Sequence, residues 1–259
     1  MATINWEKAA LTSEIAYSKA LKSEPVEYPQ FIHMVNPFVP WNGDFNRVLG
    51  VKMTNFQSFD DIISQIETIH REKALERPGR FDISPPVLEK NHWQEFLSQK
   101  GYQLSTAIFF CAPTVKYNLP PEYTLTIPSQ DEYLDWFHRL VKSRGYYEEK
   151  WFQTIQPLQL NFSQVFRPYW LLKERHLVGW VYCANLSNFA RLFEVEINEA
   201  YRGQGIGTLL LQAIKAEGYK MGAEYILLQA GEHLRRFYES AGFHECTRNS
   251  VIWLKSKNA

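Results

Sequence analysis

A strand, a glycine-rich turn and a long helix follow one another in EVEINEAYRGQGIGTLLLQAIKAEG, residues 194–218. The free N–H groups at a helix start and the positive end of the helix dipole attract anions. Glycines let the backbone approach a bulky diphosphate closely, and Arg202 could add charge-assisted contacts. The helix has an apolar stripe with helical spacing. The segment predicts an α/β layer with a site for a phosphate-bearing ligand.

Three interpretations of this turn follow from the residues alone. A Walker A loop is excluded because Gly207 is followed by Thr208 and Leu209 rather than by Lys and Ser or Thr. A dinucleotide fingerprint is disfavoured because the glycines are spaced G-x-G-x-G and the next strand ends in Gln229 and Ala230, without the acidic residue. A purely structural turn remains open.

Two motifs together resemble the GNAT acetyltransferase superfamily. Arg202, Gly205 and Gly207 match its R-x-x-G-x-G signature, and FYESAGF at 237–243 is similar to its aromatic-Tyr-Glu-x-x-Gly-Phe stretch. The resemblance implies that the turn holds the pyrophosphate of acetyl-CoA, while the preceding strand splays from its neighbour and pairs with the pantetheine arm. The cofactor-binding residues it implies are Ile197, Asn198, Arg202, Gly203, Gln204, Gly205, Ile206, Gly207, Thr208 and Tyr238.

The chain departs from the family pattern at two positions. Glu199 stands where members often carry Pro, and Gly231 stands where they often carry Asn. The second departure removes one usual contact near the cofactor.

Three side chains are candidate catalytic groups. Glu194 and Glu196 lie two residues apart, so we expect them on one strand face, with Phe193 on the other. An amine must lose a proton before it attacks a thioester, and either glutamate could accept that proton while both attract a cationic acceptor. A solvated strand face is the alternative. Tyr238 matches the family tyrosine that protonates the departing thiolate, and a packed helix tyrosine is its alternative.

Aromatic residues are frequent where the family places its acceptor-lining helices. They could shape a pocket, although core packing accounts for at least half of them. They are Trp136, Phe137, Tyr146, Tyr147, Trp151 and Phe152.

Prolines at 113, 120 and 121 mark the expected boundary between two domains, 1–118 and 119–259. The first lacks the glycine loop but resembles a smaller, degenerate GNAT-like domain of tandem acetyltransferases, with an unrelated α+β domain as the alternative. The expected fold is therefore two-domain α/β (α+β), with a mixed, mostly antiparallel, splayed sheet flanked by helices.

Composition excludes several functional classes. The 259 residues carry a formal net charge of zero, so neither nucleic acid nor an anionic membrane is an expected partner. No apolar run is long enough to cross a membrane, and a cytoplasmic location is expected. The three cysteines show neither metal-ligand nor disulfide spacing, and we expect no metal. The E-x-x-H pair of Glu67 and His70 is interpreted as a solvated helix face.

The predicted activity is direct transfer of an acetyl group from acetyl-CoA to a primary amine, in a ternary complex without a covalent intermediate. The acceptor would be a small molecule, a peptide or a protein, and the enzyme a monomer or a homodimer. The alternatives are a larger acyl or aminoacyl donor, or a non-catalytic CoA-binding or interaction module.

Overall fold

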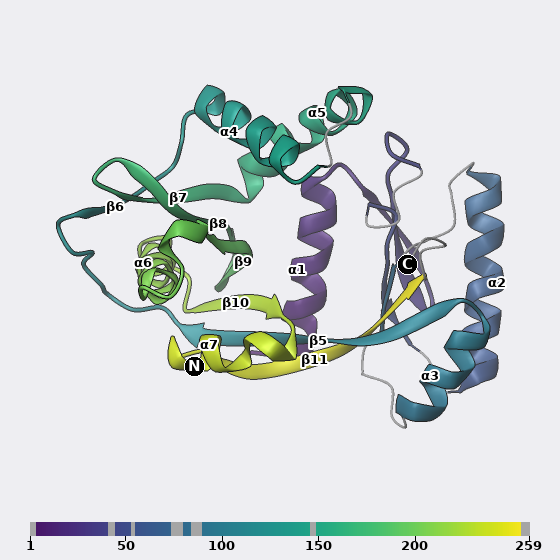
Figure 1. Ribbon diagram of the computed structural model, residues 1–259. Helices are drawn as coiled ribbons and strands as arrows, with labels where there is room; N and C mark the ends of the chain where they lie inside the picture. The colour runs from purple at the N-terminus through teal and green to yellow at the C-terminus, as the bar shows by residue number, and fades with distance from the viewer. Residues whose placement is uncertain are drawn as a thin grey trace. The chain divides into compact units, whose positions relative to one another are not determined.

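The computed structural model describes residues 4–40, 45–52, 55–73, 80–83, 90–145 and 149–254 (Figure 1). The chain divides into two compact units, the first formed by residues 1–108 and 247–259 and the second by residues 109–246. Strands β5 (Tyr102–Pro113) and β11 (His244–Leu254) are each divided between the units.

The first unit is a mixed sheet with strands in the order β1-β2-β3-β4-β11-β5. Strands β3 and β4 are parallel and are connected through helix α2, whereas β1–β2, β2–β3 and β4–β11 are antiparallel. Its elements are α1 (Trp6–Ala20), β1 (Glu24–Tyr28), β2 (Phe31–Val35), β3 (Val48–Val51), α2 (Phe56–Glu72), β4 (Arg80–Ile83) and α3 (Lys90–Gln99).

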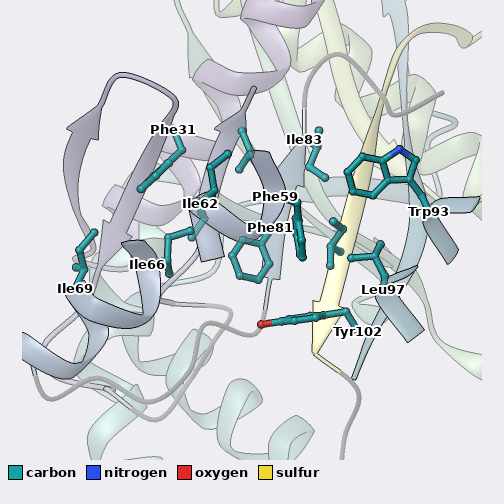
Figure 2. Packing of buried hydrophobic residues seen from close by; sticks show 13 residues of the cluster. Phe31, Phe59, Ile62, Ile66, Ile69, Phe81, Ile83, Trp93, Leu97 and Tyr102 are labelled. Carbon is teal, nitrogen blue, oxygen red and sulfur yellow. The ribbon is translucent and has the colours of Figure 1, made fainter. Parts of the chain in front are cut away.

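Helix α2 packs its isoleucine stripe onto this sheet. Phe59, Ile62 and Ile66 are almost fully buried among side chains from β4, α3 and β5 (Figure 2). Apolar residues three to four positions apart share one helix face, so this burial follows directly from the sequence spacing.

The polar interior of the first unit contains two groups that the sequence did not predict. Arg47 is buried and bonds Glu14 and Asp82, with 3.0 Å between Arg47 Nη2 and Asp82 Oδ2. His70 is also buried, and its Nε2 lies 2.9 Å from His33 Nε2. The prediction that His70 lies on a solvated helix face is therefore wrong.

The second unit has the strand order β11-β5-β10-β9-β8-β7-β6. Helix α6 connects the parallel strands β9 and β10, while β6–β7, β7–β8 and β8–β9 are antiparallel. Its elements are β6 (Tyr123–Thr126), α4 (Gln130–Ser143), α5 (Glu149–Val165), β7 (Arg167–Lys173), β8 (His176–Leu186), β9 (Phe189–Ile197), α6 (Ile206–Lys220), β10 (Tyr225–Ala230) and α7 (Arg235–Ser240), with short 3₁₀ turns η1 (Glu199–Tyr201) and η2 (Glu232–Leu234).

Helices cover both faces of the strands in the second unit. Trp136 of α4 packs on Trp180 of β8, whose neighbour Gly179 faces Leu210 of α6. Successive strand residues point to opposite faces, so α4 and α6 lie on opposite sides of β8 (Figure 1). The expected mixed, mostly antiparallel sheet with flanking helices is confirmed.

The compact units divide the chain differently from the expected domains 1–118 and 119–259. The first unit ends at residue 108 and also contains residues 247–259. The assignment of separate roles to two domains stays a prediction.

Candidate active site

The turn after β9 is held by bonds within itself. Asn198 accepts a hydrogen bond from the Ala200 amide at 3.3 Å. Arg202 Nε donates to the Ile197 carbonyl at 3.2 Å, and Gln204 Nε2 donates to the Ala200 carbonyl at 3.1 Å. Arg202 therefore uses its Nε to fix the loop, and its two terminal nitrogens have no bond to any described residue.

Helix α6 begins at this turn without a side-chain cap. Its N-cap is Gly205, whose φ of 78° lies in the left-handed region that glycine adopts without strain. Gly203 has a φ of 74°, and a Cβ built on either glycine would meet nothing within 4 Å. The turn thus leaves open space at the start of α6, as an anion site at a helix start requires.

A pocket of about 420 Å³ opens beside this helix start. Its volume falls in the range of small-molecule sites, about 300–1,000 Å³. Seven of the residues implied by the family resemblance line it: Ile197, Arg202, Gly203, Gly205, Ile206, Gly207 and Thr208. Asn198, Gln204 and Tyr238 do not line it, whereas Val195, Glu196, Tyr201 and Phe237 do. Sequence reasoning missed Tyr201, Val195 and Phe237 as lining residues, although Phe237 belongs to the quoted FYESAGF motif.

Strand β9 has a free backbone edge next to the pocket. It pairs with β10 at Phe189, Ala190 and Arg191 only, six residues before β9 ends at Ile197. On its other edge, β9 pairs with β8 as far as Ile197. The expected splay is present, and it leaves main-chain groups of β9 open to an extended ligand.

A β-bulge at Glu194 changes the expected alternation of β9. Phe193 pairs with Tyr182 and Glu196 with Trp180, so two residues of β9 oppose one residue of β8. Glu194 has a φ of 48°, a left-handed conformation that is rare for a residue with a side chain. Phe193 and Glu196 consequently lie on one face, and the prediction that they lie on opposite faces is wrong.

Glu196 is neutralised by a residue that the sequence did not indicate. Arg144, the C-cap of α4, forms an ion pair with its carboxylate. Both side chains remain partly exposed. The pairing lowers the negative charge that Glu196 can offer to a cationic acceptor.

Glu194 is the candidate base whose carboxyl pKa is shifted. The residue is exposed, yet desolvation of its carboxyl group raises its pKa. Arg144 opposes the rise and Glu196 adds to it, so all three groups lie near one another.

Two tyrosines lie next to Glu194. The hydroxyls of Tyr133 and Tyr182 are 3.1 Å apart. Burial raises the pKa of Tyr133 to about 12, and the negative charge of Glu194 contributes to the rise. Burial and Glu194 also raise the pKa of Tyr182. Both phenols therefore stay protonated at neutral pH and can donate hydrogen bonds.

Tyr238 lies behind the pocket wall. It is 6 % exposed, and its ring stacks on Phe110 with centroids 5.7 Å apart. Its sequence neighbour Phe237, which lines the pocket, contacts it edge to face. Burial raises the pKa of Tyr238, and the Arg191 guanidinium opposes that rise. The structure brings Tyr238 close to the pocket, and its role as an acid stays a prediction.

The aromatic residues of α4 and α5 belong to the core. Trp136, Phe137 and Phe152 are each less than 9 % exposed. Tyr146 and Tyr147 lie outside the described residues, as does the side chain of Trp151.

The described residues contain no group of three or more His, Cys, Asp or Glu side chains arranged to hold a metal ion. In the same part of the chain, every helix is too short or too polar to span a membrane.

Comparison with known proteins assigns this site to a family. Residues 129–243 match the family model described as "Acetyltransferase (GNAT) family". This segment belongs to the GNAT family. The segment contains α4, α5, β9, the glycine turn, α6 and Tyr238, so the family match covers the whole candidate site.

Solved structures show that the GNAT fold extends over nearly the whole chain. A conserved protein of unknown function from Staphylococcus epidermidis has a TM-score of 0.67 at 12 % identity, covering 91 % of this chain and 96 % of that one. A GCN5-related N-acetyltransferase from Kribbella flavida has a TM-score of 0.64 at 13 % identity, covering 95 % and 96 %. A tandem GNAT protein of the clavulanic acid pathway gives 0.50 at 11 %, covering 95 % and 94 %. At these identities the likeness concerns the fold.

The first unit repeats the strand–helix–strand connection of the site with a different helix start. Helix α2 joins parallel β3 and β4, as α6 joins parallel β9 and β10. In α2, Asn55 and Ser58 form a capping box, with 2.8 Å between the Ser58 amide and Asn55 Oδ1. The Asn55 side chain thus bonds a backbone N–H at the start of α2, whereas Gly205 has no side chain to bond the N–H groups at the start of α6.

Proposed function

We propose that the second unit transfers an acetyl group from acetyl-CoA to a primary amine without a covalent enzyme intermediate. The observation that carries the proposal is the uncapped start of α6 beside the free edge of β9, with Glu194, whose pKa is raised, on the same strand. A diphosphate, an extended pantetheine arm and a thioester would meet these parts in that order.

Acetyl-CoA, the acetyl donor, would be held mainly by backbone groups of the protein. The amides of Ile206, Gly207 and Thr208 would bind the diphosphate, and the terminal nitrogens of Arg202 would add charge. The open edge of β9 from Val195 to Ile197, apart from the Ile197 carbonyl that Arg202 already bonds, would pair with the amide groups of pantetheine.

Glu194 would act as the general base. Its raised pKa brings a carboxylate nearer to neutral pH, where a base works best. The amine proton would move to Glu194 directly or through water. Glu196, already paired with Arg144, would orient the site rather than accept the proton.

Collapse of the tetrahedral intermediate needs two further groups. A free N–H of β9 would stabilise the oxyanion. Tyr238 would give its phenolic proton to the departing thiolate. The Arg191 charge, which opposes the rise of its pKa, would stabilise the tyrosinate that remains.

The test is release of free CoA from a panel of thioesters and amines by the full chain, with thermal shift as the binding measurement. Acetyl-CoA should raise the melting temperature, and at least one primary amine should release CoA. Faster release from longer acyl-CoA or from an aminoacyl donor would replace the acetyl assignment. Tight binding without release for any acceptor would replace the enzyme with a CoA-binding module.

A further inference from the structure

Two cysteines that lie far apart in the sequence meet in the second unit. Cys111 lies on β5 and Cys246 on β11, which are neighbouring strands (Figure 1). The Cys246 thiol donates to the Phe109 carbonyl at 3.4 Å. Cys246 also lies near enough to Cys111 to lower the Cys111 pKa. The pairing of β5 and β11 therefore brings the two thiols close together.

A histidine completes the cluster. His244 Nε2 lies 3.1 Å from Cys111 Sγ. His244 and Cys246 are two residues apart on β11, so both side chains point to the face that Cys111 occupies. An imidazole at this distance can accept the Cys111 proton and leave a thiolate, which is the reactive form of cysteine.

The two thiols differ in access to solvent. Cys111 is completely buried, whereas Cys246 is half-buried and His244 is exposed. A small oxidant can reach Cys246 first, and Cys111 is placed behind it as the second thiol. Because no metal-binding group exists among the described residues, this cluster lacks the geometry of a metal site.

We propose that Cys111 and Cys246 are an oxidation site that forms a reversible disulfide under a peroxide, with His244 as the proton carrier. The proposal does not depend on the acetyltransferase activity. Directly paired residues of neighbouring strands lie about 4.5–5.5 Å apart and diagonal ones about 7–8 Å, so the two cysteines lie at or near the Cα separation of about 4.4–6.8 Å that a disulfide spans.

The reaction takes two balanced steps. The Cys246 sulfur attacks hydrogen peroxide, the O–O bond breaks, and the departing oxygen leaves as water with the thiol proton. The product is a sulfenic acid on Cys246. The Cys111 thiolate, whose proton is on His244, then attacks the Cys246 sulfur. The S–O bond breaks, hydroxide takes the His244 proton and leaves as water, and the disulfide remains.

The third cysteine is an internal reference. Cys183 is buried, and desolvation raises its pKa to about 12, so it stays a thiol at neutral pH. Cys183 should remain reduced under conditions that link the other two.

Oxidation at this site would act next to Tyr238. Phe110, adjacent to Cys111, stacks on the Tyr238 ring, and Phe243, adjacent to His244, meets the ring edge to face. A disulfide between β5 and β11 would therefore form next to the residues that pack on the Tyr238 ring.

The experiment treats the reduced full chain with graded hydrogen peroxide, alkylates the remaining thiols and maps peptides by mass spectrometry. The expected product is a Cys111–Cys246 linked peptide within one chain, reversed by dithiothreitol, while Cys183 is alkylated. Independent over-oxidation of the two cysteines, links only between chains, or equal oxidation of Cys183 would overturn the proposal.

Variants separate the parts of the site. Cys183→Ser should link at the wild-type rate, and Cys246→Ser should leave Cys111 reduced. His244→Gln keeps both thiols and should link about tenfold more slowly near neutral pH, the effect of a tenfold smaller thiolate fraction. A Cys246→Ser chain with rapidly oxidised Cys111, or an unchanged rate in His244→Gln, would contradict the assigned roles. Circular dichroism checks that each variant is folded.

Discussion

Gly207 lies so close to Phe237 that a Cβ at position 207 would stand 2.9 Å from two carbons of the ring. Both residues line the candidate CoA pocket. Gly207→Ala should therefore displace the ring into the pocket. Overpacking of this kind costs about 1–3 kcal/mol, and we expect a CoA affinity roughly 5- to 150-fold weaker by titration calorimetry.

Gly222 provides the matched control. It has a left-handed φ of 80°, whereas Gly207 lies in helix α6. A Cβ at Gly222 meets nothing within 4 Å, and Gly222 does not line the pocket. Gly222→Ala should lower the melting temperature without changing CoA affinity. Equal affinity losses in the two variants would show that a general loss of stability, not the Phe237 contact, weakens binding.

Glu194→Gln should remove the acidic limb of the pH–rate profile. The carboxyl group must be deprotonated to act as a base, so the wild-type rate should fall as pH drops through its raised pKa. A positioned base contributes about 10²- to 10⁴-fold, and kcat should fall within that range. Glu196→Gln is the comparison, because Glu196 is already paired with Arg144. Unchanged acidic limbs in both variants would exclude a glutamate base.

Arg144→Gln should move the acidic limb to higher pH. The Arg144 charge lowers the pKa of Glu194, and its loss also frees the charge of Glu196, which raises that pKa. Both changes act in the same direction. Arg139→Gln, which removes an exposed ion pair with Asp135 on the same helix, should leave the limb in place. A limb that stays or moves to lower pH in Arg144→Gln would contradict the assignment of Glu194.

Tyr238→Phe should lower kcat by about 10²-fold or more while CoA binding changes little, because only the acid is lost. The ring and its stack on Phe110 are kept. Tyr219→Phe is the matched control, because Tyr219 is 46 % exposed on α6 and does not line the candidate CoA pocket. Single-turnover kinetics measures the chemical step, and full turnover by Tyr238→Phe would eliminate its role as the acid.

Arg47→Ala should destabilise the first unit strongly. The change removes the buried charge that Glu14 and Asp82 share and leaves them with Arg80, whose Nη2 lies 2.9 Å from Asp82 Oδ1 and 3.9 Å from Glu14 Oε2. Removing one partner of a buried ion pair costs about 3–5 kcal/mol. Chemical denaturation should show this loss, with the exposed Arg139→Ala as a near-neutral reference. A loss below about 1 kcal/mol would mean that water enters and solvates the two carboxylates.

The sequence predicted features that depend on neighbouring residues. Ser129 and Glu132, three residues apart, form a capping box at α4, and α6 begins at the Gly205 turn. Helix α1 was not predicted because its buried face consists of small and polar residues, including Glu14, instead of an apolar stripe. At α2, Asn55 and Ser58 both suit a cap, and the structure places Asn55 at the cap and Ser58 at the third helical residue.

Features that depend on strand pairing could not be predicted. The bulge at Glu194 is visible only in the register between β9 and β8, and it puts Glu196 on the same strand face as Phe193. The Arg144 ion pair depends on where α4 ends relative to β9. Cys111 and Cys246 meet because β5 and β11 are neighbours, which their spacing in the sequence does not reveal.

A crystal structure of the full chain with bound CoA tests the central claim most directly. We predict diphosphate oxygens within hydrogen-bonding distance of the Ile206, Gly207 and Thr208 amides, and pantetheine along the free edge of β9. A diphosphate bound elsewhere, or a helix start that stays empty at saturating CoA, would contradict the account.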